Sequence, residues 1–283
     1  MSHPAPTSMR AVLTAEAIGT FLLVFFGCGA VASGVLMGEV VGIGQMAIIW
    51  ATAIALAIYA VSAISGAHLN PSVTLAFVVH RKLPLRSAGW YLVGQMVGAI
   101  AAAALLWAIF HNIVAAFEFE HGLVRGEPGS QKAAMILACY FPNPASLGTD
   151  AKAFAQFSHG QAILAEIVGT ALLVFAIFAL IDHANRNRPI PSVGAVFIGL
   201  TVGLVMCTIA PLTMAALNPA RDLGPRLIAF LAGYGPIAFP GPRGGFFTVY
   251  ILAPLVGGVI GGFLYDRMLH RPHRNVPDVD DAE

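Results

Sequence analysis

The chain has 283 residues, of which 58% are hydrophobic and only 10% are charged, and its mean hydropathy is +0.79. Soluble domains carry about 25% charged residues, so this composition excludes an ordinary soluble protein and indicates a membrane protein with several spans. The net charge of +1 gives no basis for expecting a nucleic-acid partner. The three cysteines, Cys28, Cys139 and Cys207, are scattered without metal-ligand spacing and argue against a disulfide framework.

Apolar segments of two lengths follow one another along the chain. Six are long enough to cross about 30 Å of hydrocarbon as helices, and two are too short to cross and are typical of re-entrant segments. The predicted spans are Ala11–Met37, Met46–Ser65, Ala88–Phe110, Gln161–Ile181, Val193–Ala210 and Phe246–Tyr265, and the short stretches are Pro71–Val79 and Pro219–Leu231.

Lys and Arg are more frequent on the side of the two termini than on the opposite side. The positive-inside rule therefore predicts that both termini are cytoplasmic, in a plasma (inner) membrane, and that the long segment His111–Gly160 faces outward. Residues 1–10 are predicted to be a cytoplasmic tail, residues 11–269 a single membrane domain, and residues 270–283 a polar, disordered tail.

Two pairs of matching stretches reveal an internal duplication. "AEAIGTFLLVF" matches "AEIVGTALLVF" at an offset of 150 residues, and "GAHLNPSVTL" matches "MAALNPARDL" at 148. Each half, about 11–110 and 161–265, contains three spans, and an odd number of spans inverts the second half. The predicted fold is an all-α membrane protein with six transmembrane helices and two re-entrant half-helices in an inverted 3+3 repeat.

Each short stretch begins with Asn-Pro, at Asn70 and Asn218, which is a helix-start signal. Half-helices from opposite sides would meet near the midplane, and their amino ends carry partial positive charge and unpaired N–H groups. Each asparagine can cap its helix with its side-chain oxygen and donate from its amide into a cavity. Such a site repels cations and favours a neutral oxygen acceptor.

The residues before the two asparagines have no helix-start signal, so their carbonyls are predicted to line a path as a row of acceptors. Acceptors facing a pair of donors suit water or a polyol. The predicted carbonyl-lining residues are Gly66, Ala67, His68, Met214 and Ala216.

The motifs "SGAHLNPSVT" and "NPARDLGPR", together with the repeated AE-x-x-GT, resemble those of the major intrinsic proteins, the aquaporin and glycerol-facilitator family. The resemblance runs from about Met9 to Leu269. It implies an aquaporin-like channel that works as a homotetramer in the lipid bilayer. Asp222 and Arg226 are similar to residues of the glycerol-facilitator branch.

The resemblance also implies a four-residue selectivity filter on the outer side, at Trp50, Met206, Ala215 and Arg221. Trp50 would present an apolar wall, and Arg221 would donate to hydroxyl groups and repel cations. Glycerol facilitators resemble one another in having an aromatic residue near Ala215 and a small one near Met206. In this chain the sizes are reversed, with a small residue at Ala215 and a large one at Met206. This departure leaves water, urea and neutral metalloid hydroxides such as arsenite open beside glycerol.

Five polar residues near these motifs need an interpretation. Glu16 and Glu166 are intramembrane carboxylates, which are either proton relays or acceptors for the backbone of the re-entrant loops, and their symmetry favours the second role. Asp222 is expected to order the outer loop through N–H groups rather than to act in catalysis. The ring of His68 is expected to pack at the cytoplasmic vestibule, since no other metal ligands have suitable spacing. Ser72 replaces alanine in the first Asn-Pro motif, and its hydroxyl is expected to satisfy a group at the helix end.

The leading hypothesis is a passive channel for small neutral solutes, most of all glycerol and water, that excludes ions and protons and needs no cofactor or metal. A proton-coupled secondary transporter that uses Glu16 and Glu166 is the rival from another class. A channel for urea or a metalloid hydroxide is the third possibility. No arrangement typical of an enzyme's catalytic residues is recognised, so catalysis is not expected.

Overall fold

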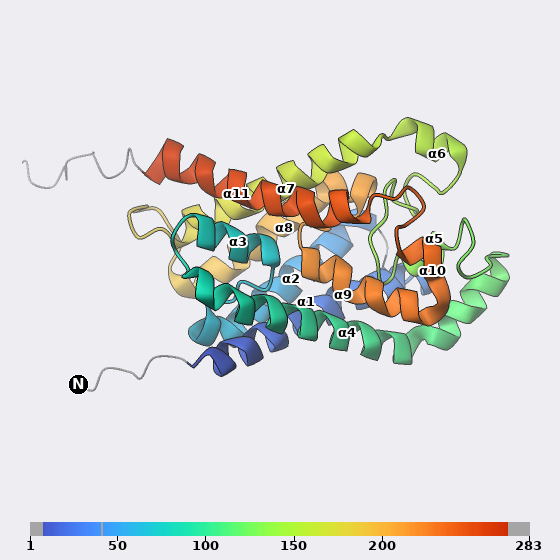
Figure 1. Cartoon of the computed structure of the whole chain (residues 1–283), viewed down its shortest axis with the longest axis horizontal. Helices are drawn as coiled ribbons and strands as arrows, with labels where there is room; N and C mark the ends of the chain where they lie inside the picture. Colours follow the sequence, from blue (N-terminus) through green and yellow to red (C-terminus); the bar gives the residue numbers. More distant parts are fainter. Residues whose placement is uncertain (1–7, 41, 271–283) are drawn as a thin grey trace, which may run out of the picture.

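A computed structural model of the chain describes residues 8–40 and 42–270. Six of its helices in these ranges are long and apolar enough to cross a membrane. They are α1 (Met9–Met37), α2 (Gly42–Ser65), α4 (Leu85–Glu120), α7 (His159–Ile181), α8 (Pro191–Thr213) and the continuous helix formed by η2 (Thr248–Leu252), α11 (Ala253–Tyr265) and η3 (Asp266–His270). Figure 1 shows them running along the long axis of the molecule. The predicted number of spans is confirmed.

The two short stretches are the half-helices α3 (Pro71–Val79) and α9 (Pro219–Ala229). Proline occupies the first turn of each, where its missing N–H leaves no bond unmade, and an asparagine in extended conformation caps each one. They lie one after the other along the long axis in Figure 1. α3 packs against α4 and α11, and α9 packs against α4. Together they cover the depth that one ordinary span would cover.

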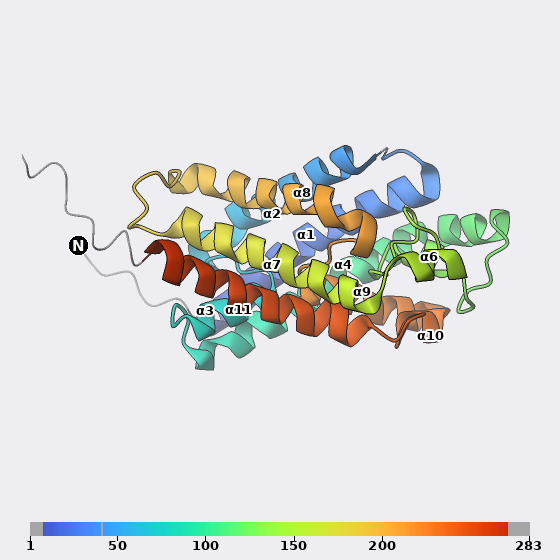
Figure 2. The ribbon, with the colours of Figure 1, turned by 90° about the horizontal axis from the view of Figure 1, so that it is seen from above.

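Close helix pairs repeat between the two halves of the chain. α1 packs against α4 as α7 packs against α11, and α2 against α8 joins the halves (Figure 2). A Cβ added to Gly98 would lie 2.1 Å from the carbonyl oxygen of Ala17, and one added to Gly257 would lie 2.3 Å from that of Ile167. Only glycine permits these approaches, so the two halves use the same backbone-to-backbone contact.

The glycine of each AE-x-x-GT motif makes room for a leucine of the re-entrant loop. A Cβ on Gly19 would lie 2.4 Å from Leu69 Cδ2, and one on Gly169 would lie 2.7 Å from Leu217 Cδ2. Both leucines immediately precede the capping asparagine. In both halves, therefore, the glycine of the duplicated motif packs against the leucine of the duplicated loop.

Most helix boundaries differ from the predictions by a few residues, and the end of α4 differs by ten. α4 continues past the predicted end at Phe110 to Glu120, because Glu118 near its end accepts hydrogen bonds from Arg125 and Tyr234 and so anchors the extension. α9 ends at Ala229, not at Leu231, and continues as the π-helical turn η1 (Phe230–Tyr234), where Gly233 has a φ of 97°. In the last span the π-helical turn η2 comes just before Pro254. Proline has no N–H to donate to the preceding turn, and its ring crowds a carbonyl there, so the α-helical hydrogen-bond pattern is interrupted.

The predicted outward segment 111–160 folds into the end of α4 and two short helices, α5 (Gln131–Ala134) and α6 (Ala151–Gln156). Another short helix, α10 (Gly235–Ala238), lies at the same end of the bundle (Figure 1). The first described helix begins, and the last one ends, at the opposite end. The predicted tails, residues 1–10 and 270–283, lie mostly outside the described residues. Within the described part, α1 already begins at Met9 and η3 includes His270, so these residues are helical and not part of a tail.

Candidate functional site

A cavity of about 330 Å³ lies between the two half-helices in the middle of the bundle. The loops 66–70 and 214–218, which precede α3 and α9, form one part of its wall, and apolar side chains such as Leu23, Ile58 and Leu173 form the other. All the predicted carbonyl-lining residues, Gly66, Ala67, His68, Met214 and Ala216, border this cavity. The path is therefore polar along the loops and apolar along the helices.

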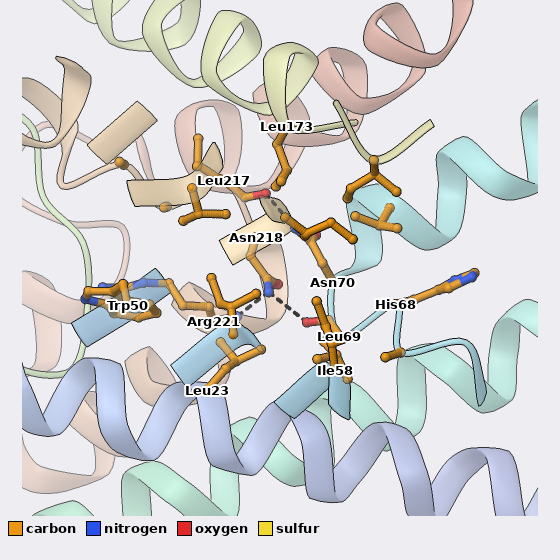
Figure 3. A pocket seen from close by; sticks show the side chains of 18 of the residues that line it. Leu23, Trp50, Ile58, His68, Leu69, Asn70, Leu173, Leu217, Asn218 and Arg221 are labelled. Carbon is orange, nitrogen blue, oxygen red and sulfur yellow. Dashed lines mark hydrogen bonds between the residues drawn. The ribbon is translucent and has the colours of Figure 1, made fainter. Parts of the chain in front are cut away.

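The two asparagines meet at the middle of this cavity (Figure 3). Asn70 Oδ1 accepts from the N–H of Ser72 at 2.8 Å, and Asn218 Oδ1 accepts from those of Ala220 and Arg221 at 3.0 and 3.2 Å. These bonds are N-caps, and they orient each side-chain amide away from its own helix.

The sequence predicted that both side-chain amides are free to donate into the cavity, but each is partly engaged. Asn70 Nδ2 donates to the carbonyl of Leu217 at 2.9 Å, and Asn218 Nδ2 donates to that of Leu69 at 2.8 Å. A carboxamide has two N–H hydrogens, so one remains on each asparagine. The pair therefore joins the two loops and still offers one donor from each half.

Both loops have an unusual backbone. Ala67 and Leu69 in the first loop, and Met214, Ala215 and Leu217 in the second, have φ values between 47° and 66°. This left-handed region is unfavourable for side chains other than glycine by about 1–2 kcal/mol per residue. The loops therefore need strong partners elsewhere to keep this shape.

Glu16 provides those partners for the first loop. Its carboxylate is fully buried and accepts from the N–H groups of His68 and Leu69 at 2.9 and 2.7 Å. The hydroxyl of Ser65 and the amide of Gln95 donate to it as well, at 2.6 and 2.8 Å. Four donors saturate this carboxylate.

Glu166 does the same for the second loop. It is fully buried and accepts from the N–H groups of Ala216 and Leu217 at 3.0 and 2.8 Å. The two glutamates thus hold equivalent N–H groups, at the two positions before each asparagine. Gln95 adds a donor in the first half alone, and no sequence motif pointed to it.

A second cavity, of about 580 Å³, opens on the side of the bundle that carries α5. The residues that border both cavities mark the junction between them. They are Trp50, Met206, Met214 and Arg221. Three of the four predicted filter residues are in this set, whereas Ala215 borders only the inner cavity. The side chain of Met214 was not predicted to take part, because only its carbonyl was considered.

Arg221 and Trp50 form a charged and aromatic pair at this junction. The guanidinium carbon of Arg221 lies 4.9 Å from the centroid of the Trp50 ring, and both side chains are buried. Among the described residues, neither Arg221 Nη1 nor Trp50 Nε1 has a hydrogen-bond partner. Buried donors nearly always have one, so two donors are left for whatever occupies the junction. Figure 3 places both residues on one side of the asparagine pair and His68 on the other.

The duplication does not reproduce this junction at the opposite end of the inner cavity. At the 148-residue offset, Trp50 corresponds to Ile198, Met206 to Ile58, and Arg221 to Val73. Ile198, Ile58 and Val73 all border the inner cavity. Among the described residues, the charged junction is therefore present at one end of the cavity and has no counterpart at the other.

Asp222 and Arg226 form a buried ion pair behind the junction. Arg226 Nε donates to Asp222 Oδ2 at 2.8 Å, and Arg226 Nη1 donates to the carbonyl of Ala238 at 2.8 Å. Asp222 Oδ1 accepts from the N–H of Cys139 at 2.7 Å, in the outer loop. This contact is the kind of loop ordering expected of Asp222.

The side chains of His68 and Ser72 differ in the contacts that they make. The His68 ring lies between those of Phe77 and Tyr91, with centroids 4.3 and 4.5 Å away, and its Nδ1 is 3.2 Å from Thr74 Oγ1. The expectation for Ser72 is wrong: its hydroxyl is buried and has no hydrogen-bond partner among the described residues. The residue lies where α3 packs closely against α11: a Cβ added to Gly258 would lie 2.8 Å from the carbonyl oxygen of Ser72.

Comparisons with known proteins agree with this architecture. The family model described as "Major intrinsic protein" matches residues 4–265. The chain is 38% identical to the "Glycerol uptake facilitator protein" of Pseudomonas aeruginosa over 273 residues, covering 96% of this chain and 93% of that protein. It is 37% identical to the "Propanediol uptake facilitator PduF" of Citrobacter freundii over 259 residues, covering 91% of each.

The structure is similar to that of the aquaglyceroporin from Plasmodium falciparum, with a TM-score of 0.80 and 23% identity. The match covers 95% of this chain and all of the other, and it confirms the predicted fold. The relatives confirm the predicted resemblance to the glycerol-facilitator branch. A multi-pass membrane protein built from an inverted repeat, with two asparagine-capped half-helices meeting in its core, this chain belongs to the major intrinsic protein family.

Proposed function

We propose that the protein is a passive channel for glycerol, related small polyols and water. The observation that carries this proposal is the pair of buried donors on Arg221 and Trp50 at the junction of two cavities, neither of which has a partner in the described part of the chain. The names of the relatives, glycerol and propanediol uptake facilitators, support the same substrate class.

The junction offers what a polyol needs to leave water. Arg221 Nη1 and Trp50 Nε1 donate to its hydroxyl groups, while Met206 at the junction and Ala215 on its inner side present apolar surface to its carbon chain. The fixed charge of Arg221 repels cations at this junction. We assign the selectivity filter to Trp50, Met206, Ala215 and Arg221 for these reasons.

Deeper in the path, the two loops present backbone acceptors and the asparagines present donors. A solute or water oxygen at the midplane accepts from Asn70 and Asn218 and must donate away from them, which interrupts a chain of proton-conducting waters. The positive amino ends of α3 and α9 add a barrier to cations. Neutral molecules pass because they carry no charge to be repelled.

The contacts of the two glutamates argue against a proton-coupled transporter. Glu16 and Glu166 each accept from two backbone N–H groups of a loop held in an unfavourable conformation. A proton relay would release these bonds in every cycle. We therefore assign a structural role to both carboxylates.

The proposal also covers the orientation in the membrane, the domain boundaries, the oligomeric state and the candidate solutes. The Lys and Arg distribution supports cytoplasmic termini in a plasma (inner) membrane, and the described chain ends lie at one end of the bundle (Figure 1). We place one channel domain at 11–269, with repeats at about 11–110 and 161–265. The family resemblance supports a homotetramer, and the exchanged bulk at Met206 and Ala215 keeps urea and arsenite among the candidate solutes.

Stopped-flow measurements on proteoliposomes test the proposal. Outward gradients of glycerol, water, urea and arsenite are imposed with and without a protonophore. Glycerol and water permeability above that of protein-free liposomes, insensitive to the protonophore, is the expected result. Glycerol flux that collapses with the proton gradient would support the transporter, and no flux of glycerol or water would refute the channel.

A further inference from the structure

Two of the four residues that border both cavities are methionines, Met206 within α8 and Met214 directly after it. Both side chains are nearly buried, at 5% and 6% exposed. Ala215 borders only the inner cavity. The side-chain bulk at the junction, apart from Trp50 and Arg221, therefore comes from two thioethers.

Met214 is held in place by its backbone and by its sulfur. It has a φ of 66°, and its N–H donates to the carbonyl of Ala210 at 2.9 Å. Its Sδ accepts from the N–H of Tyr140 at 3.3 Å. Tyr140 follows Cys139, whose N–H is held by Asp222, so the ion pair behind the junction also positions the methionine.

The junction thus combines two kinds of surface. Within residues 8–40 and 42–270, Arg221 Nη1 and Trp50 Nε1 are donors without partners, whereas the methionines supply methylene, methyl and thioether groups. Thioether side chains are apolar, polarisable and adaptable in shape. A solute that carries hydroxyl groups on one edge and a methyl or methylene group on the other satisfies both surfaces at once.

We propose that Met206 and Met214 determine the specificity of the channel and favour vicinal diols with an apolar end, such as 1,2-propanediol, over solutes that are polar all round, such as urea. The inference rests on the proposed function and names its substrate class. Transfer of one methyl group from water to an apolar wall is worth about a fourfold preference. The flexible side chain of Met206 yields to the methyl group, where a rigid ring at position 215 would not.

Met214→Gln and Met206→Gln test this proposal, because glutamine keeps the length of methionine and makes the wall polar. Each variant is expected to lower the ratio of propanediol to urea permeability about fourfold. Met214→Leu and Met206→Leu, which stay apolar, are expected to conserve the ratio. Met46→Gln is the matched control, because Met46 borders the outer cavity but not the junction.

The outcomes separate this inference from the proposed function. A wild-type protein that conducts neither glycerol nor water refutes the proposed function itself. A conducting wild type whose ratio is unchanged in both junction glutamine variants, or is changed as much by Met46→Gln, refutes the methionine proposal alone. Melting temperatures of all variants in detergent identify any that fail to fold, and the two junction positions test the proposal independently.

Discussion

Asn70 and Asn218 each donate a hydrogen bond to the carbonyl that precedes the other asparagine, at 2.9 and 2.8 Å. Each also caps its own half-helix. The two loops are therefore tied to each other at the point where a solute passes, and neither can change shape without the other. The predictions below begin with this pair.

Asn218→Asp keeps the oxygen that caps α9 but replaces the amide donor with a second oxygen, which faces the carbonyl of Leu69. Two buried acceptors without a hydrogen between them destabilise the fold by about 1–3 kcal/mol. We expect a lower melting temperature and a lower glycerol permeability. Asn112→Asp, at an exposed position of α4, is the control. Equal effects of both substitutions would contradict a special role for the pair.

Arg221→Ala removes the fixed charge from the junction. A unit charge repels a cation 4 Å away by about 4 kcal/mol at an effective dielectric constant of 20, so cation or proton conductance in planar bilayers should rise. Arg221→Lys keeps the charge and should stay close to the wild type. Background conductance in the alanine variant would mean that the asparagines and half-helices alone exclude cations.

Glu166→Gln replaces one acceptor oxygen with an NH₂ group that faces a backbone N–H of Ala216 or Leu217. The loop loses a buried hydrogen bond, and we expect a loss of about 1–3 kcal/mol in unfolding free energy together with reduced flux. The control is Glu120→Gln at the exposed end of α4. A variant with wild-type stability but altered proton dependence would revive the role of Glu166 as a relay.

Ser72→Ala removes a buried hydroxyl that has no hydrogen-bond partner among the described residues. Burying an unpaired hydroxyl is unfavourable by about 1–3 kcal/mol, so the variant should be at least as stable as the wild type, with unchanged glycerol flux. Thermal melting in detergent measures the first and stopped-flow the second. A clear loss of stability would reveal a partner for this hydroxyl that the contacts do not include.

Asp182, just after α7, predicts how stability depends on pH. Burial opposes its ionisation, but hydrogen bonds from His270, Ala184 and Tyr265 outweigh burial and lower its pKa to about 2. A lowered pKa gives stability that is present above the unfolded value of 3.8 and is lost as the pH falls through about 2. The full contribution is about 2 kcal/mol.

Asp182→Asn should therefore be less stable than the wild type at about pH 6 and should approach it at about pH 2. Melting curves in detergent over this range measure the difference. A constant difference across the range would show that packing, not the charge, accounts for the effect of the substitution.

Much of the fold was predictable because its signals are local. Pro71 and Pro219 mark the half-helices in the chain itself, since the steric demands of Asn-Pro act within one turn. The end of α4 was missed because it depends on Arg125 and Tyr234, which lie beyond the helix in sequence and meet Glu118 only after folding. The part of Met214 was missed because a side chain's position at a junction depends on the loop that carries Tyr140.

The sequence by itself determined the number of spans, the inverted repeat and the two capping asparagines, because hydrophobic length, duplication and helix capping are properties of short stretches of chain. Only the tertiary structure decided that the amides of Asn70 and Asn218 are shared with the opposite loop, and that no described residue pairs with the Ser72 hydroxyl. It also decided which side chains border both cavities. These features depend on distances between residues of the two halves, and burial in the packed core decides which of their polar groups find a partner.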